Sequence, residues 1–436
     1  MSAHTPPITY FLGNARTYEF ERLREAGYRL GLIRDTTGRG PSALDSAFDA
    51  VIGWDPADGV AGLSRLLREA PHGEVAGVLN LREAYCEAYA DLLTALGLPT
   101  LPRARVAALR SKAVMRSAFR EHIGPDSTGL HAQVREPADV VAFGARVGWP
   151  VILKPAALYS SLFVVTIDGP GDVARAFTKV TRGLADHVAA KGLPDRFRAL
   201  QAEQFLPGSN HSVDVVLDRD GQAHPSPVVD VETGRDHGAH DFHHFARFAP
   251  SRLPDQQPMI KLALKAVEAL GLRSGAAHVE FIQTSQGPRL LEVGLRPGGH
   301  RIRMLDQGYG VDFIGAYLAG QRGDPVDLGP RHPGRPFAIV TPFPARTGRF
   351  VGVRGLERVT MLPSYRGHRI FGRPGSPAGS AADGHWQVMS IELTHDDPAQ
   401  VAADVKAIRA WDDLVLVDQP ETGAAASADT LTGANL

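Results

Sequence analysis

The sequence predicts a multidomain protein of mixed α/β and α+β architecture, and three observations support this fold class. The chain has 436 residues, which is too long for one compact core and indicates two or three domains. Its first hundred residues alternate short apolar strands with helical segments, as in a parallel sheet of βαβ units. From about residue 331 onward, strand-like pieces accompany a single helix, which is typical of a small α+β domain.

The first region, residues 1–100, is expected to be a Rossmann-like layer. Its apolar runs are short and rich in β-branched and aromatic residues, and helical segments separate them. The first turn contains Gly13 alone, so the G-x-G-x-x-G dinucleotide fingerprint is missing and NAD binding is not expected. The expected strands are 8–12, 28–33, 50–54 and 75–80, and the first helix spans about 16–26.

Prolines at 99–104 mark a boundary, so a central region is expected over 101–330 and a C-terminal α+β domain over 331–418. Residues 419–436 have little apolar bulk and are predicted to be a disordered tail. Further strands are expected at 150–155, 162–167, 198–206, 212–218, 276–283 and 289–294, in FAIVTPF, RFVGVRG and WQVMSIEL, and helices at 136–147, 170–191, 256–270, 300–320 and 398–410.

Composition excludes several classes of protein. Hydrophobic residues make up 43% of the chain and charged residues 22%, which is ordinary for a globular protein. The net charge of −1 leaves no basic excess for nucleic acid. No apolar run is long enough to span a membrane, and the segment MSAHTPPITYFLG lacks the basic and apolar regions of a secretory signal, so a cytoplasmic protein is expected. Cys86 is the only cysteine, which excludes a disulfide framework and a multi-thiolate metal site.

Two short strands flanking the turn TSQG carry the residues with the clearest chemistry. If the turn is centred near Gln286, Glu280 lies opposite Glu292, and His278 lies opposite Gly294. Opposed like charges destabilise a sheet, so a hard divalent cation is the natural compensation. A solvent-facing hairpin with exposed glutamates is the alternative. Arg296, presented just before Pro-Gly-Gly, could hold phosphoryl or carboxylate oxygens and favours the functional reading.

The segment HVEF, a short turn and LLEVGLRPGG resembles the magnesium-binding hairpin of the ATP-grasp superfamily, specifically its carboxylate–amine ligases. The branch it most resembles contains the L-amino-acid ligases that make dipeptides. The resemblance covers about residues 100–330 and implies an ATP-grasp fold with the Rossmann-like layer before it and the small domain after it. It implies ATP and Mg²⁺, with Mn²⁺ as a substitute, and Glu280 and Glu292 as metal ligands.

The same resemblance implies a nucleotide site, and its parts can be looked for. Lys112 in RSKAVMR and Lys154 in PVILKP stand where the family has phosphate-contacting lysines, and only seven lysines occur in the chain. For each, an exposed structural lysine is the alternative. Adenine is expected at the hinge in LQAEQFLPG, and the phosphates are expected at a loop. The residues implied are Glu203, Gln204, Phe205 and Leu206 for adenine, Ser160 and Ser161 for phosphate, and His211 for the ribose.

Three positions depart from the family pattern. The loop after Lys154 reads AALYSSLF and lacks the usual glycines, whose backbone amides cover phosphates. Gly294 stands where relatives commonly have an asparagine ligand, and Asn210 stands where many have an acid for the ribose. These departures leave the details of phosphate and metal contact open, but they do not remove the two carboxylates or the two lysines.

A histidine-rich stretch, expected to be irregular, spans 232–254. His240 and His244 at i, i+4 would suit zinc on a helix, but nearby glycines disfavour a helix and no H-E-x-x-H pattern occurs. The resemblance implies instead that this stretch borders the substrate, and His243 is the candidate contact. A solvated polar loop is the alternative.

The reaction implied is ATP + carboxylate + amine giving an amide, ADP and phosphate through an acyl phosphate. Arg296 would stabilise developing negative charge, and Gly298, Gly299 and His300 would line the substrate pocket. Small-molecule acids, most simply amino acids, and amines are the expected partners, and a homodimer is left open. The rival readings are an ATP-grasp enzyme that activates bicarbonate or a non-amino-acid carboxylate, and a catalytically silent nucleotide-binding protein.

Overall fold

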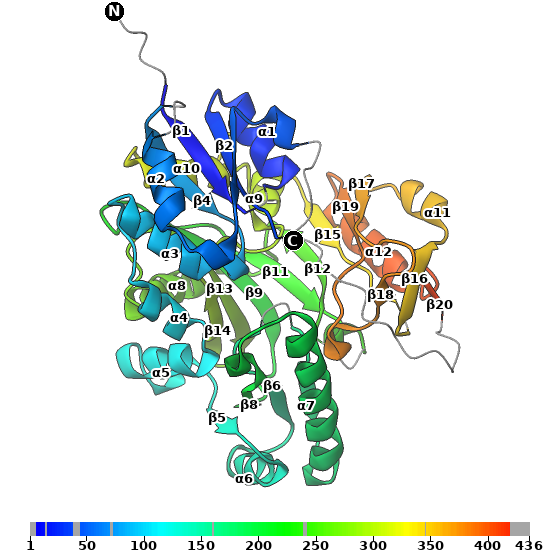
Figure 1. The fold of residues 1–436 in the computed structure, drawn as a ribbon. Coiled ribbons are helices and arrows are strands. Elements are labelled where there is room, and N and C mark those ends of the chain that lie inside the picture. Colours follow the sequence, from blue (N-terminus) through cyan, green and yellow to red (C-terminus); the bar gives the residue numbers. More distant parts are fainter. Residues whose placement is uncertain are drawn as a thin grey trace, which may run out of the picture.

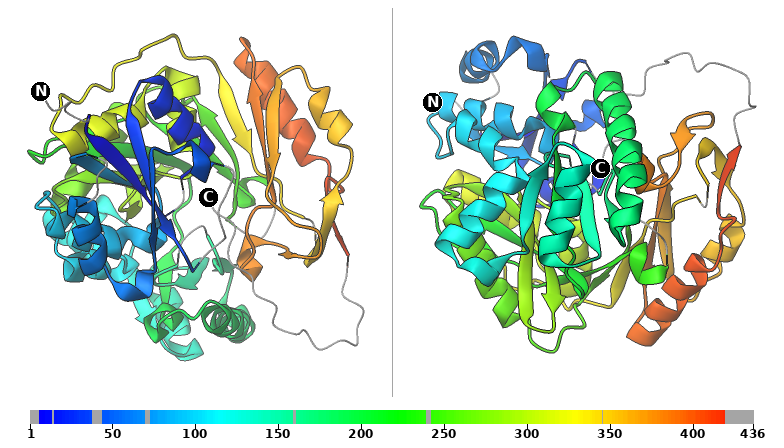
Figure 2. Two further views of the ribbon diagram at one scale, coloured as in Figure 1. Left: turned by 45° about the horizontal axis from the view of Figure 1, so that its top comes forward. Right: turned by 90° about the horizontal axis from the view of Figure 1, so that it is seen from below.

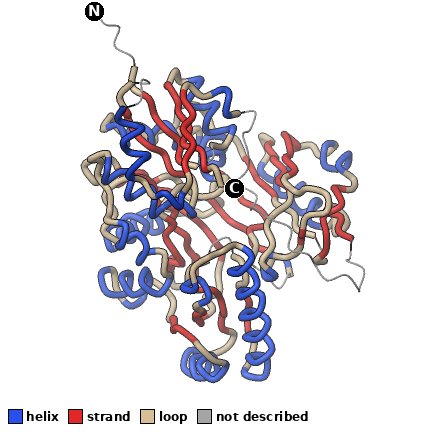
Figure 3. The backbone as a smooth tube through the Cα atoms, in the orientation of Figure 1, coloured by secondary structure: helices blue, strands red, loops and turns tan. Residues whose placement is uncertain are grey.

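The computed structural model describes residues 6–13, 15–37, 44–69, 73–158, 161–238, 242–344 and 346–418. The predicted tail and Ser160 therefore lie outside the described residues. The central sheet lies between the N-terminal sheet, a lower subdomain and the C-terminal region (Figure 1). In the tube view, strands run through the interior of each part and many helices lie toward the outside (Figure 3). No helix in the described ranges is long and apolar enough to cross a membrane.

The N-terminal region is a four-stranded parallel sheet with the order β3-β2-β1-β4, as its alternating pattern predicted. Both faces are buried, because successive side chains of β1 enter two different cores. Phe11 packs with Tyr317 and its neighbours, whereas Tyr10 packs with Leu92 and Leu93. The elements are β1 (Ile8–Leu12), α1 (Thr17–Glu25), β2 (Arg29–Asp35), β3 (Ala50–Trp54), α2 (Ala61–Glu69), β4 (Val75–Asn80) and α3 (Cys86–Ala95).

The lower subdomain is an antiparallel sheet with the order β5-β8-β6-β7, and its helices cover it (Figure 2, right). The strand predicted at 162–167 begins only at Val165, because Ser161 and Phe163 have positive φ angles of 56° and 58° and form a turn. Helices α4 (Arg103–Leu109) and α5 (Lys112–His122) precede this subdomain and pack in the central core. The elements of the subdomain are β5 (His131–Val134), α6 (Pro137–Val147), β6 (Val151–Pro155), β7 (Val165–Ile167), α7 (Val173–Ala190) and β8 (Leu200–Gln204).

A nine-stranded sheet forms the centre, in the order β14-β13-β9-β11-β12-β15-β19-β17, with β10 beside β9. The prediction that 232–254 is irregular is wrong in part, because β11 extends into it as far as Thr233, β12 spans His244–Ala249 and the two strands pair with each other. The strands and helices of the central region are β9 (Ser209–Leu217), β10 (Ala223–Pro225), β11 (Val229–Thr233), β12 (His244–Ala249), α8 (Gln257–Ala269), β13 (Gly275–Thr284), β14 (Gly287–Gly294), α9 (Arg301–Tyr309) and α10 (Phe313–Arg322).

The C-terminal region shares this sheet, because β15 pairs with β12 and β19 pairs with β15. The boundary expected at residue 330 therefore lies between β12 and β15, two strands that pair in the same sheet. A separate three-stranded sheet, β18-β16-β20, completes the region. Its elements are β15 (Phe337–Val340), β16 (Gly348–Val353), α11 (Leu356–Thr360), β17 (Tyr365–Ile370), β18 (Pro377–Ala378), β19 (Met389–Thr394), α12 (Pro398–Arg409) and β20 (Val415–Asp418).

Candidate active site

The hairpin β13–β14 has the predicted opposition of Glu280 to Glu292 and of His278 to Gly294. The turn is one residue tighter than expected, since Thr284 pairs with Gly287. An irregularity in the ladder after Glu280 then restores the register. The prediction of the opposed pair is confirmed, although the centring of the turn was slightly wrong.

Alternation along β13 decides which way these carboxylates face. Ala277, Val279 and Phe281 are buried in the core beneath α8. The residues between them, His278 and Glu280, therefore emerge on the opposite face, where both line a cavity. The hairpin is thus not a solvent-facing one.

Each carboxylate of the pair already has a cationic partner. Lys112 Nζ lies 2.9 Å from Glu292 Oε2, and His278 Nε2 lies 3.2 Å from Glu280 Oε1. His278 Nδ1 lies 3.0 Å from Asp214, so the ring faces carboxylates with both nitrogens. Burial lowers the pKa of His278, but Asp214 outweighs burial and the net shift is upward. Burial raises the pKa of Glu280, but His278 outweighs burial and the net pKa lies well below its usual value.

Two cavities meet at the opposed glutamates. The larger has a volume of about 650 Å³ and the smaller about 120 Å³. Because the same five residues line both, the cavities are adjoining chambers of one site. The shared lining residues are Leu158, Leu162, His244, Glu280 and Glu292.

The smaller chamber contains the expected lysines and the hinge. Lys112 and Lys154 line it, as do the hinge residues Glu203, Gln204, Phe205 and Leu206. The Glu203 carboxylate is engaged by cations, with Arg116 at 2.7 Å and Lys154 at 2.8 Å. Burial raises the pKa of Glu203, but Arg116 and then Lys154 reverse that effect, so the net pKa is lowered. The side chain thus orients Lys154, and an adenine contact through Glu203 stays a prediction.

The structure reveals a cap on this chamber that the sequence did not indicate. The Arg235 guanidinium lies 4.4 Å from the ring centre of Phe205 and 5.8 Å from that of Phe242. Arg235 also donates to Thr166 Oγ1 at 2.6 Å, which ties it to β7. Both phenylalanines line the chamber. Nothing in the local sequence distinguishes Arg235 from other exposed arginines, so only the tertiary fold identifies it.

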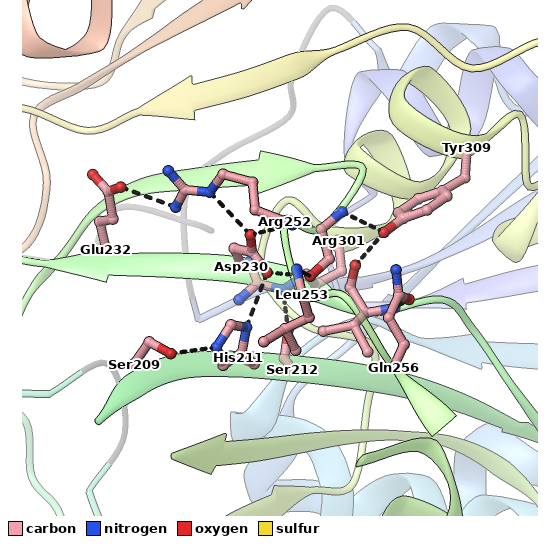
Figure 4. A network of polar contacts seen from close by, with 12 residues as sticks. Ser209, His211, Ser212, Asp230, Glu232, Arg252, Leu253, Gln256, Arg301 and Tyr309 are labelled. Atoms are coloured by element: carbon pink, nitrogen blue, oxygen red, sulfur yellow. Dashed lines mark hydrogen bonds and ion pairs between the residues drawn. The ribbon is translucent and has the colours of Figure 1, made fainter. Parts of the chain in front are cut away.

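His211 faces away from the chamber. It shares the face of β9 that carries Val213 into the core, whereas its neighbour Asn210 lines the smaller chamber. His211 Nδ1 lies 2.9 Å from Asp230 and Nε2 lies 2.7 Å from Ser209 (Figure 4). These bonds hold the ring in a structural network, so the geometry gives no support to the predicted ribose contact.

The larger chamber receives the other predicted residues. His243, Arg296, Gly299 and His300 line it, and Arg296 Nε lies 3.3 Å from Glu83 of the N-terminal region. His300 has a positive φ of 63° at the start of α9. Its Nε2 lies 3.2 Å from the Gln387 amide nitrogen, which can only donate. Burial and surrounding arginines hold the pKa of His300 well below its usual value, so the ring is neutral.

Gly298 acts through its backbone. Its N–H donates to Asp214 Oδ1 at 2.6 Å, and a Cβ there would lie 2.4 Å from both His278 and Arg301. The residue is therefore a glycine because the loop packs tightly behind the chamber, and not because it contacts a ligand. This packing accounts for Gly298, whereas Gly299 has open space around it and lines the chamber, so a substrate contact there stays a prediction.

The loop after Lys154 is fastened to the C-terminal region. Phe163 N donates to Ala381 O at 3.0 Å, and Lys179 of α7 lies 2.8 Å from Asp383. Ser161 lines the smaller chamber. A loop without glycine can thus cover this chamber, because a tertiary contact supports it where glycines would otherwise supply the turn.

The histidine-rich stretch is only partly described, since His240 lies outside the described residues. His237 Nε2 lies 3.1 Å from Glu232, and His244 begins β12. Within the described ranges, no three His, Cys, Asp or Glu side chains are grouped so as to hold a metal. The Glu280–Glu292 pair still fits a cation that takes its other ligands from phosphate and water, which is usual for magnesium.

Comparison with known proteins agrees with this geometry. The family described as "ATP-grasp domain" matches residues 147–303. The uncharacterized protein y4rH of Sinorhizobium fredii is 23% identical over 70% of this chain and 60% of its own length. Carnosine synthase 1 of Homo sapiens is 27% identical over 69% of this chain and 38% of its own length. The chain therefore spans less than two thirds of these relatives.

Solved structures share the fold over nearly the whole chain. The L-amino acid ligase from Bacillus licheniformis superposes with a TM-score of 0.73 at 20% identity, covering 96% of this chain and all of that one. A carboxyaminoimidazole ribonucleotide synthase from Aspergillus clavatus, complexed with ATP, has a TM-score of 0.68 at 15% identity and covers 94% and 99%.

Proposed function

We propose that this chain, whose residues 147–303 match the ATP-grasp domain family, is an ATP-dependent ligase joining a carboxylate to an amine. One observation carries the proposal. The opposed carboxylates of Glu280 and Glu292 stand where the smaller, lysine-lined chamber opens into the larger one. Such a junction suits phosphoryl transfer from a nucleotide on one side to an acid on the other.

In this proposal Lys112 and Lys154 hold the phosphates, and the hinge backbone at 204–206 borders the adenine. Magnesium held by Glu280 and Glu292 supplies positive charge at the phosphate oxygens when bound. Arg296 holds an oxygen of the carboxylate as it takes the γ-phosphoryl group and again as the amine adds. The amine nitrogen forms the new bond to carbon, phosphate leaves, and the amine proton is released. The loop near Ser161 covers the site and so keeps water away from the acyl phosphate.

The relatives support an amino acid as the carboxylate, since an L-amino acid ligase and a carnosine synthase are among them. The test is a screen for ADP release over pairs of amino acids and amines, with and without bicarbonate. We expect release that depends on both an acid and an amine. Release that requires bicarbonate would favour a carboxylating enzyme, and tight ATP binding without release would favour a silent nucleotide-binding protein.

Glu292→Ala tests the metal assignment. The variant should lose substrate-dependent ADP release by at least about 1,000-fold, because a charge-stabilising element of phosphoryl transfer is removed. Glu268→Ala, which removes an exposed glutamate of α8, is the matched control and should retain full activity. Circular dichroism checks that both variants fold. Substantial turnover by a folded Glu292→Ala variant would contradict the assignment.

A further inference from the structure

Two buried arginines on the wall of the larger chamber have no acidic partner. Arg247 of β12 is 6% exposed and Arg301, the first residue of α9, is 1% exposed, and both line the chamber. In the part of the chain that the structure describes, no Asp or Glu forms an ion pair with either guanidinium. Elsewhere in the site the cations are paired, as Lys154 is with Glu203. These two arginines are therefore exceptional.

Within the described residues, both arginines donate hydrogen bonds only to neutral groups. Arg247 donates to His244 O and to Thr341 Oγ1, each at 3.3 Å, and its buried Nε has no partner. Arg301 donates to Ser212 Oγ at 2.7 Å, a contact drawn in Figure 4, and to Gly299 O at 3.2 Å. Neutral acceptors satisfy some of the N–H groups but do not balance two positive charges.

The surroundings add further donors and little negative charge. His300, which lies beside these arginines, is neutral, and Arg16 lines the same chamber with a buried Nε that has no partner. Burial, and then the neighbouring Arg301, lower the pKa of Arg247 to about 9 although Glu280 opposes the shift. Asp214 and Glu280 are the negative charges that act on Arg301, and Glu280 also acts on Arg247, but His278 already pairs with both carboxylates. Arg247 and Arg301 can therefore bind an anion that comes from outside the protein.

That anion differs from the nucleotide phosphates. Lys112 and Lys154 line the smaller chamber, whereas Arg247 and Arg301 line only the larger one. It also differs from the reacting carboxylate, which the proposed function assigns to Arg296. Planar guanidinium groups match a carboxylate with two parallel hydrogen bonds.

We propose that Arg247 and Arg301 bind a non-reacting carboxylate of a substrate and so determine specificity. This inference rests on the proposed ligase function and names the substrate class more closely. The group could be the free carboxylate of the amine-bearing substrate or a second carboxylate of the acid. Either source leaves the bond-forming step unchanged, because this carboxylate only anchors the molecule.

Matched ligands separate the two sources in the wild-type protein. Calorimetric titration and ADP release are measured with one constant acid while L-amino acids or their carboxamides serve as the amine, and with one constant amine while L-glutamate or L-glutamine serves as the acid. Loss of the anchoring carboxylate should lower binding and kcat/KM by about 30-fold or more, because a buried charge is left unpaired. Discrimination against carboxamides identifies the amine-bearing substrate as the source. Discrimination between glutamate and glutamine identifies the acid.

Arg247→Gln then assigns the effect to this wall. The variant should lose the discrimination through a raised KM, and Arg247→Lys should restore part of it. Because the substitution removes an unbalanced buried charge, its denaturation midpoint should equal or exceed that of the wild type. A purely structural arginine would give a lower midpoint. Arg175→Gln, at an exposed site on α7, is the control and should change neither quantity.

Every outcome decides the question. Equal binding and turnover of the acids and their amides would overturn the inference while leaving the ligase function standing. Carboxylate binding that depends on Arg247, without ADP release from any pair, would support the inference and refute the proposed function. Absence of carboxylate binding in calorimetry, or discrimination that survives in Arg247→Gln, would overturn the inference.

Discussion

Replacing Glu203 by glutamine should destabilise the protein substantially, because this carboxylate balances two buried cations. Oε2 lies 2.7 Å from Arg116 and Oε1 lies 2.8 Å from Lys154, and Glu203 is 3% exposed. A neutral amide keeps the shape but leaves both cations without a counter-charge. Removing one partner of a buried ion pair typically costs about 3–5 kcal/mol.

The lower end of that range is expected here. Burial already lowers the pKa of Lys154, so this lysine can lose its proton when its partner is removed. Arg116 cannot lose its proton in this way, so its charge remains. We therefore expect Glu203→Gln to lower the free energy of unfolding by about 3 kcal/mol at pH 7. Arg116→Met, which removes the cation instead, should couple to it by at least about 1.5 kcal/mol in a double-mutant cycle.

Urea denaturation, monitored by circular dichroism, measures both the loss in free energy of unfolding and the coupling energy. Glu121→Gln is the matched control, because Glu121 is exposed on the same helix as Arg116 and its loss should cost under about 0.5 kcal/mol. An unchanged urea midpoint for Glu203→Gln would refute the ion-pair reasoning. If the KM for ATP rose at the same time, the predicted adenine contact would be the better explanation.

Three further predictions concern the surrounding residues. Gly298→Ala should cost about 1–3 kcal/mol and lower activity, because the new methyl carbon would lie 2.4 Å from Arg301; calorimetry and ADP release measure this. Arg235→Ala should raise the KM for ATP several-fold without affecting binding of the acid, since Arg235 caps the nucleotide chamber beside Phe205. Burial lowers the pKa of His244 to about 3, so the unfolded state binds one more proton than the folded state between about pH 3 and 6.5. The free energy of unfolding that the neutral ring contributes is fully present above pH 6.5 and falls by about 1 kcal/mol per pH unit below it. Denaturation of wild type and His244→Gln at pH 7.0 and 5.5 should show a smaller loss of stability in the variant, by about 1 kcal/mol, because other histidines such as His300 keep their own contribution.

Features carried by local pattern could be predicted from the sequence. The N-terminal strands follow directly from apolar runs, and β3 and β4 have the predicted bounds. The opposition of Glu280 and Glu292 followed from period-two alternation and one short turn. The ladder irregularity could not be foreseen, because it compensates a tighter turn and only the packing of both strands fixes it.

Features that depend on tertiary contacts could not be predicted. The orientation of His211 away from the nucleotide chamber depends on which face of β9 meets α8. The pairing of Glu203 with Arg116 joins residues 87 positions apart. Arg247 and Arg301 carry no local signal in a chain so rich in arginine, and only their burial without a carboxylate distinguishes them.

The central sheet runs without a break from the β13–β14 hairpin to β17 at the far side of the C-terminal region (Figure 2, left). Deletion of all residues after 330 would remove β15 and leave β12 as an unpaired edge strand. Such an edge offers unpaired N–H and C=O groups to other chains, so the truncated protein should aggregate.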